Sequence, residues 1–173
     1  MEFPLFCCKK DRIDEMRSRV RFIERYKFDV KKKSEYFTKY QLIEDELKNY
    51  TNAFQGKVVY LNCDEVQYSQ YWRYFYDNFK ALGLKKLVAT HYNPDVPKGI
   101  DRFIVDGEYV HKYEYDGTRF SKKPLQGDGD YRSEECMDIL HSADMVVTTP
   151  PTRHFCNMVR LFERLGKEYI LCR

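Results

Sequence analysis

The hydrophobic positions of the chain change their period several times, and the order of these changes predicts an α/β protein. Two short apolar runs, residues 56–62 and 85–92, enclose a segment from Tyr68 to Gly83 in which aromatic side chains recur at helical spacing. The final glycine is typical of a helix C-terminus. A strand, a helix and a strand in this order predict two parallel strands joined by a right-handed crossover. We expect the aromatic stripe to form core against the sheet, with Tyr74 and Tyr76 facing outward.

The period becomes strand-like again between Asp101 and Phe120, where Asp106-Gly107 and Asp116-Gly117 interrupt β-rich runs. Asp-Gly beside such runs is a strong hairpin signal, so we predict an inserted antiparallel excursion. The rest of the chain predicts a helix over 132–142, a strand over 144–148, a helix that ends at Gly166 and a strand over 167–172.

The amino-terminal third predicts two helices. Ile13, Met16, Val20 and Ile23 recur at intervals of three and four, which indicates an amphipathic helix that ends near Tyr26. Ser34 is expected to cap a second helix that runs toward Tyr50. We therefore divide the chain into a basic helical extension, residues 1–33, and a main domain, residues 34–173.

Length and composition narrow the class of protein. A chain of 173 residues suits one domain with a hydrophobic core, and 33% charged residues with a mean hydropathy of -0.70 exclude a membrane protein. The six cysteines are dispersed without a Cys-x-x-Cys pair, so neither a disulfide framework nor a metal site is indicated. The first residues lack the pattern of a secretory leader, and we expect a cytoplasmic protein.

Positive charge is concentrated near the amino terminus. Between Lys9 and Lys33 the chain carries eleven basic and five acidic residues. This excess can attract a phosphate backbone or an acidic protein surface, although a solvated helix face is the commoner reason for such a run. The candidate partner- or nucleic-acid-binding residues are Arg17, Arg21, Lys31, Lys32 and Lys33.

The predicted strand 144–148 ends in an unusual turn, Thr149-Pro150-Pro151-Thr152. Proline lacks a backbone donor and fixes its own φ, so two prolines stop the strand ladder and hold a rigid turn. This turn follows the carboxyl end of a strand, which is where open α/β sheets bind their ligands.

Five stretches occur in an order that resembles the EcoRI-type adenine-specific DNA methyltransferase family. They are Ser34–Thr38 with Ile43–Leu47, Gly56–Asp64, Leu82–Leu87, Gly127–Cys136 and Asp144–Pro151. The resemblance covers roughly residues 34–173. It implies a Rossmann-like sheet that binds S-adenosylmethionine and methylates the exocyclic amine of adenine.

The resemblance also implies positions for the cofactor. Phe37 and Thr38 would approach its methionine end, Cys63 and Asp64 would lie at the carboxyl tip of the first strand, and Asp130 with Tyr131 would flank its adenine. A carboxylate can accept a hydrogen bond from the adenine amine while a ring covers its face. The alternative for Gly-Asp-Gly-Asp is a plain turn.

The turn departs from the family at the residues that handle the substrate. The family has Asn-Pro-Pro-Phe, whose Asn orients the target amine and whose Phe stacks on a base flipped out of the duplex, whereas Thr149 and Thr152 stand at these places here. Losing one oriented polar contact costs on the order of 10² to 10³ in rate, and losing a stacking ring removes a further ~1–3 kcal/mol. The sequence therefore predicts weak or absent adenine methylation.

These departures leave several functions open. The first is a pseudoenzyme that binds protein or nucleic acid, as a DNA mimic or a competitor for DNA, for example a phage or other mobile-element antagonist of restriction or CRISPR defence. The second is an active S-adenosylmethionine-dependent methyltransferase with an altered substrate, in which His154 would serve as a base; the alternative for His154 is a helix-start residue without a chemical role. Relatives continue beyond the strand 167–172, so we expect a truncated sheet. Unless the basic amino-terminal helix covers it, the edge at Ile170 would favour homodimerisation or capture of another protein. The third possibility is a fragment of a longer enzyme or one subunit of a split one.

Overall fold

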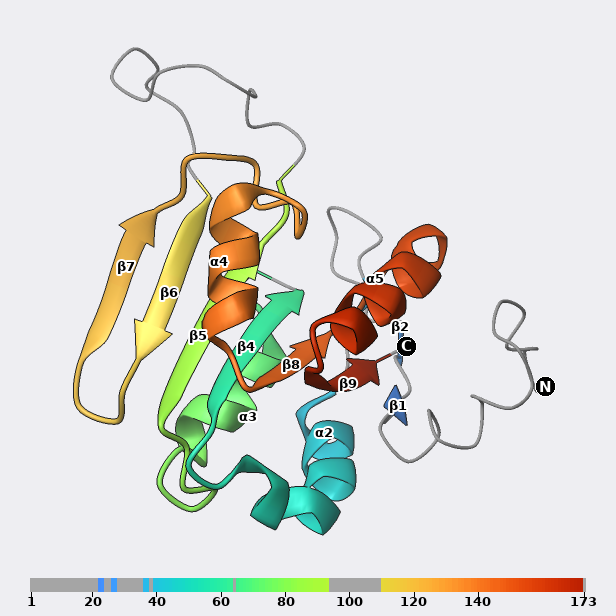
Figure 1. Ribbon diagram of the computed structural model, residues 1–173. Coiled ribbons are helices and arrows are strands. Elements are labelled where there is room, and N and C mark those ends of the chain that lie inside the picture. Colours follow the sequence, from blue (N-terminus) through green and yellow to red (C-terminus); the bar gives the residue numbers. More distant parts are fainter. Residues whose placement is uncertain are drawn as a thin grey trace, which may run out of the picture.

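The computed structural model describes residues 22–23, 26–27, 36–37, 39–63, 65–93 and 110–172, with only the backbone described at Cys63, Cys172 and the three isolated pairs. Within these residues lies a seven-stranded sheet in the order β1-β9-β8-β4-β5-β6-β7 (Figure 1). Its strands are β1 (Phe22–Ile23), β4 (Val58–Cys63), β5 (Lys86–His91), β6 (His111–Tyr115), β7 (Phe120–Pro124), β8 (Met145–Thr148) and β9 (Glu168–Cys172). The helices are α2 (Tyr40–Leu47), the 3₁₀ helix η2 (Lys48–Phe54), α3 (Gln70–Asp77), α4 (Glu134–Ser142) and α5 (Thr152–Arg164).

The sheet grows outward from β4 in both directions. β5 pairs with β4 in parallel on one side and β8 pairs with it in parallel on the other. β9 continues in parallel beyond β8, while β6 and β7 are antiparallel beyond β5. The predicted α/β class and the parallel strand–helix–strand unit are confirmed.

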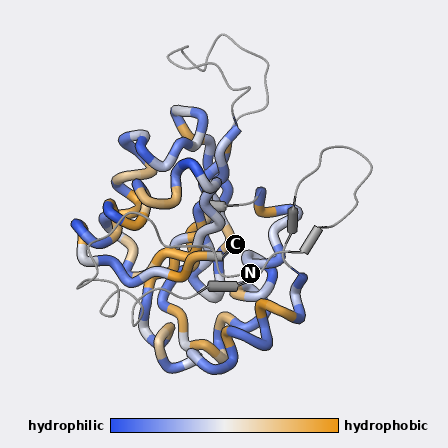
Figure 2. The backbone as a smooth tube through the Cα atoms, turned by 90° about the vertical axis from the view of Figure 1, so that its right-hand side faces the viewer, coloured by the Kyte–Doolittle hydropathy of each residue, from blue (hydrophilic) through white to orange (hydrophobic). Residues whose placement is uncertain are grey.

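Alternating side chains of the central strands pack into two cores, one on each face of the sheet. Val59 and Leu61 of β4 face α2 and α3, whereas Tyr60 between them faces α4 and α5. Figure 1 shows these helix pairs on opposite sides of the strands, which gives three layers. In Figure 2 the hydrophobic stretches gather toward the middle of the molecule, and the outer loops are mostly hydrophilic.

Local capping explains where two of the helices begin. The Ser69 side chain accepts a hydrogen bond from Trp72 N at 3.2 Å, and Ser133 accepts one from Cys136 N at 3.4 Å. These bonds satisfy amides that lack a partner inside the helix. At the other end of α4, Lys167 Nζ donates to the carbonyls of His141 and Ala143 at 2.8 and 2.6 Å, which ties that helix to the start of β9.

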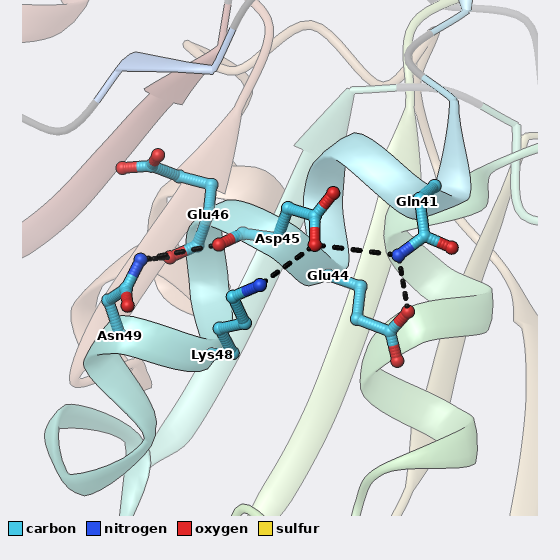
Figure 3. Close-up of polar contacts among 6 residues, drawn as sticks. All are labelled: Gln41, Glu44, Asp45, Glu46, Lys48 and Asn49. Carbon is cyan, nitrogen blue, oxygen red and sulfur yellow. Dashed lines mark hydrogen bonds and ion pairs between the residues drawn. The ribbon is translucent and has the colours of Figure 1, made fainter.

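Hydrogen bonds and an ion pair link neighbouring polar side chains along α2 (Figure 3). Lys48 pairs with Asp45 at 2.9 Å, and Gln41 donates to Glu44 at 3.0 Å. The Asn49 side chain donates to the last carbonyls of the helix. The opposite face carries Ile43 and Leu47, which are fully buried. The helix is therefore amphipathic, as its spacing predicts.

The aromatic helix α3 is shorter than the sequence predicts. Its aromatic stripe is largely core, which is confirmed, but Tyr74 is buried rather than outward and burial raises its pKa to about 12. Tyr76 is 41% exposed, as expected. The helix ends at Asp77 rather than near Gly83. Beyond Asn78 the bonding changes, because Phe79 N donates to the Tyr76 carbonyl at 3.3 Å, three residues back instead of four.

The predicted amino-terminal helix is wrong where the structure describes it. Phe22–Ile23 pairs in parallel with Leu171–Cys172 at the edge of β9, and Tyr26–Lys27 pairs with Tyr36–Phe37, the short strands β2 and β3. Pairing with Phe22–Ile23 gives hydrogen-bond partners to backbone groups at the edge of β9, which a helix over the same residues would leave unpaired. These hydrogen bonds outweigh the amphipathic pattern. The edge of β9 expected to be open thus already has a partner at these two residues.

The second helix also begins later than predicted. The Lys39 backbone precedes its first turn without a side-chain cap, so Ser34 is not the capping residue.

Some predicted features cannot be compared with the structure: Arg17, Arg21 and Lys31 to Lys33 lie outside the described residues, as does the Asp106-Gly107 turn. None of the described helices is both long and apolar enough to cross a membrane.

The β6–β7 turn yields a test of pH dependence. Backbone amides of Arg119 and Thr118 donate to the Asp116 carboxylate and, with the Thr118 hydroxyl, hold its pKa at about 2. A folded pKa below the unfolded value of about 3.9 stabilises the turn above about pH 4, and the effect is lost as pH falls toward 2. We predict that the Thr118 and Arg119 amide resonances move with a midpoint near pH 2. The Asp116→Ala variant should lose this transition and exchange both amides faster, and a midpoint near 3.9 in the original chain would contradict the assignment.

Candidate functional site

The strand order identifies one edge of the sheet as the candidate site. After β4 the chain crosses to β5 on one side, and it later returns to β8 on the other side. Side-by-side parallel strands whose connections diverge leave a crevice at their carboxyl ends, where ligands of open α/β sheets bind. Here the crevice expected from the topology lies beyond Cys63 of β4 and Thr148 of β8.

The Pro-Pro turn forms the β8 side of this crevice. The Thr148 hydroxyl donates to the Asn62 carbonyl, which ties the end of β8 to the end of β4. Thr149 is 8% exposed, whereas Thr152, the first residue of α5, is exposed. Pro151 precedes the helix, and its carbonyl accepts from His154 N at 2.8 Å. The turn thus leads directly from strand to helix.

The loop before α4 is packed against the carboxyl end of β5. Gly129 has φ +75°, and a Cβ there would lie 1.9 Å from the His91 carbonyl oxygen. The Asp128 carbonyl accepts from Asn93 N at 2.8 Å, and Asp128 is buried. Burial lowers the pKa of His91, against the opposing effect of the Glu65 carboxylate. The Gly-Asp-Gly-Asp stretch is therefore a constrained turn whose position is set by β5.

Asp130 is held in an ion pair with Arg132. The guanidinium donates to both carboxylate oxygens, at 2.9 and 2.6 Å, and the backbone amide of Arg132 donates to Oδ1. This hydrogen bonding is the main reason that the pKa of Arg132 is raised. The Asp130 side chain is 15% exposed. Each carboxylate oxygen has more than one lone pair, so Asp130 can still accept a hydrogen bond from a ligand.

Tyr131 brings this loop into contact with the Pro-Pro turn. Its ring meets the His154 imidazole edge to face with 6.0 Å between centroids, and the Arg132 guanidinium lies 5.4 Å from the same ring. Two sequence stretches more than twenty residues apart therefore meet beside the crevice. His154 Nε2 accepts from Arg153 Nε at 3.1 Å, which occupies the lone pair that a general base would use.

Sequence reasoning missed a buried polar network below the crevice. Asn62 Nδ2 donates to Thr90 Oγ1 at 2.9 Å and to the Tyr60 hydroxyl at 3.1 Å, and these two hydroxyls lie 2.6 Å apart. Thr90 also lies 3.9 Å from Cys136 Sγ. Burial raises the pKa of Tyr60 well above its ordinary value, so its hydroxyl stays protonated. The available signal was Tyr60 and Asn62 two residues apart in a strand, a spacing that places both on one face.

For the other cofactor residues predicted from the sequence, the structure describes at most the backbone. Phe37 lies in β3 and Cys63 ends β4, but only their backbones are described, and Thr38 and Asp64 lie outside the described residues.

Among the residues with a described position, no group of three His, Cys, Asp or Glu side chains could hold a metal. A cavity of about 380 Å³ lies at the opposite edge, beside Lys57, Asp144 and Glu168, at the amino ends of β4, β8 and β9.

Comparison with known proteins agrees with this arrangement. The family model described as "Adenine-specific methyltransferase EcoRI" matches residues 26–172. The chain belongs to this family. It is 36% identical over 140 residues to Type II methyltransferase M.MpnI of Mycoplasma pneumoniae and 31% identical over 140 residues to M.MgeORF184P of Mycoplasma genitalium, covering 81% of this chain and 40% of each relative.

A third relative comes from a distant bacterium. Type II methyltransferase M.EcoRI of Escherichia coli is 35% identical over 153 residues, which cover 84% of this chain and 47% of that protein. The chain therefore spans less than half the length of these three curated relatives. No solved structure gives a significant match.

The packing of Gly129 generates a second test. Gly129→Ala introduces both a Cβ overlap with the His91 carbonyl and an unfavourable left-handed residue, so the loop must move. We expect a loss of at least ~1–2 kcal/mol of unfolding free energy, measured by urea denaturation. Gly127→Ala is the matched control, because nothing lies within 4 Å of a Cβ there and its φ is not positive. Equal effects of the two substitutions would contradict the described packing.

Proposed function

We propose that this chain binds S-adenosylmethionine in the crevice but methylates adenine poorly, and that it acts mainly by binding a protein or nucleic-acid partner. One observation carries the proposal. Thr149 is nearly buried and Thr152 is exposed at the places where the family has an amide and an aromatic ring. The cofactor side of the crevice and its substrate side have thus diverged from the family to different degrees.

The residues of the cofactor side fit an adenine nucleoside. The partly exposed Asp130 carboxylate can accept from an exocyclic amine, and the adjacent Tyr131 ring offers a face or edge to a purine. Phe37, Thr38, Cys63 and Asp64 belong to this half of the proposal by resemblance. When bound, the cofactor would supply an activated methyl group on its sulfonium. The chain's own task would be to hold and shield it, and no metal is part of the proposal.

The substrate side fits catalysis poorly. A threonine hydroxyl is shorter than an Asn carboxamide, so Thr149 cannot place an acceptor where the family places one. Thr152 provides no ring at the place where the family has Phe. Without a stacking platform, the energy needed to extrude a base from a duplex is less well compensated.

The partner half of the proposal concerns the basic residues near the amino terminus. Arg17, Arg21 and Lys31 to Lys33 would attract nucleic acid or an acidic protein. A binding protein of this kind would suit an antagonist of restriction or CRISPR defence encoded by a phage or another mobile element. A pull-down from host extract tests it, and a stoichiometric protein partner that is lost when these five residues are neutralised would support it.

A second candidate is an active methyltransferase with an altered substrate. Thr149 and Thr152 are smaller than Asn and Phe and leave room for another acceptor. Transfer of a labelled methyl group to DNA, RNA and protein extracts would distinguish the two. Rapid transfer to a substrate other than adenine would favour this second candidate.

The role of Asp130 gives a prediction for cofactor affinity. Asp130→Ala removes a charge-assisted acceptor worth about 1.5–3 kcal/mol, so calorimetry should show S-adenosylmethionine affinity falling by about 10- to 100-fold. Arg132→Ala is the control, because it breaks the same ion pair while keeping the carboxylate. If both variants bind as the original chain does, Asp130 does not contact the cofactor.

Restoring the family's turn gives a prediction for catalysis. The double variant Thr149→Asn with Thr152→Phe should raise single-turnover methylation of an adenine-containing single-stranded oligonucleotide by about 10²-fold or more. Thr149→Val with Thr152→Leu is a matched control of similar bulk without an amide or a ring. No gain over this control, in protein that binds cofactor, would show that the turn does not limit transfer.

A further inference from the structure

The side chain of Asn62 is fixed by its neighbours in an unusually complete way. Both hydrogens of its amide nitrogen are used, one by Thr90 Oγ1 and one by the Tyr60 hydroxyl. The two hydroxyls bond each other, and Thr90 lies within reach of Cys136 Sγ, so every hydroxyl hydrogen in the group has an acceptor. The amide therefore has a single orientation that satisfies its donors.

This orientation determines where the carbonyl end of the amide lies. Thr90 belongs to β5, and β5 and β8 flank β4 on opposite sides, so the nitrogen faces the β5 side. The oxygen of a planar amide points away from its nitrogen, which directs Oδ1 toward the β8 side of the crevice. Asn62 is partly exposed, and the nitrogen end of its amide is engaged with buried hydroxyls. The oxygen is therefore the end of the amide that can face the crevice.

Asn62 also lies directly beside the turn that has lost its amide. Leu61 is opposite Val147 in the strand register, and the Thr148 hydroxyl donates to the Asn62 carbonyl. Asn62 and Thr148 are thus neighbours on adjacent strand ends, one residue before Thr149. An acceptor held here lies beside the strand end that leads into Thr149.

We propose that Asn62 Oδ1 accepts a hydrogen bond from the exocyclic amine of an adenine base in the crevice, in place of the amide missing at residue 149. The proposal rests on the proposed function, because it places the substrate base at the β8 side of the same crevice. Asn62 is then a specificity-determining residue for a purine with an amine. A locked acceptor of this kind recognises a donor without first losing rotamer freedom.

The test compares two nucleosides that differ only in the amine. Deoxyadenosine and its analogue without the 6-amino group are titrated at millimolar concentration into the ¹⁵N-labelled full chain, with S-adenosylhomocysteine present and absent. We expect deoxyadenosine to bind about five- to tenfold more tightly, as one hydrogen bond allows. Asn62→Ala should abolish this preference, whereas Thr149→Val should retain it. The Asn62 side-chain resonance of the original chain should shift with deoxyadenosine only, which tests the contact even if Asn62→Ala does not fold.

Three results would overturn the inference: a preference that survives Asn62→Ala, a preference lost in Thr149→Val instead, or no preference in the original chain. Calorimetry of the cofactor on the same samples keeps the two proposals distinguishable. If S-adenosylmethionine does not bind while the nucleoside preference depends on Asn62, the proposed function fails and this inference stands.

Discussion

The parallel pairing of β4 with β8 positions the two strand ends on which the candidate site is built. It brings the end of the first central strand next to the Pro-Pro turn, and the Thr148 hydroxyl on the Asn62 carbonyl fixes the two ends together. The chain leaves these strands in opposite directions, the arrangement in which open α/β sheets bind ligands beyond their strand ends. A crevice at this edge is a consequence of topology and does not depend on which residues line it.

The two sides of that crevice are stabilised by different interactions. The β5 side is rigid because Gly129 packs on the His91 carbonyl and Asp130 is paired with Arg132. The β8 side relies on two prolines and a short helix start. Tyr131 and His154 meet across the two sides, but the groups proposed to hold the cofactor and those proposed to orient the substrate belong to different segments. The proposed function relies on this separation, in which cofactor binding would persist while substrate orientation weakens.

The sequence predicted what periodicity and turn chemistry encode. The central strands, α4 and the helix after the prolines follow from local pattern. The helix predicted from the amino-terminal pattern is wrong, because Phe22–Ile23 has a strand partner nearly 150 residues away that no local period reveals. The predicted length of α3 is wrong because the backbone bonding changes from four to three residues back at Phe79, which the aromatic spacing does not reveal.

At the site, sequence reasoning found the stretches but not their contacts. The meeting of Tyr131 with His154 and the bonding of Asn62 to Thr90 both join separate strands or loops, so only the fold reveals them. The central claim is that cofactor binding persists while adenine transfer is slow. Its most direct test is single-turnover methyl transfer from labelled S-adenosylmethionine to an adenine-containing oligonucleotide, with bound cofactor measured in the same sample and M.EcoRI in parallel. We expect saturable cofactor binding with transfer about 10² to 10³ slower than in M.EcoRI; transfer at the M.EcoRI rate would contradict the account.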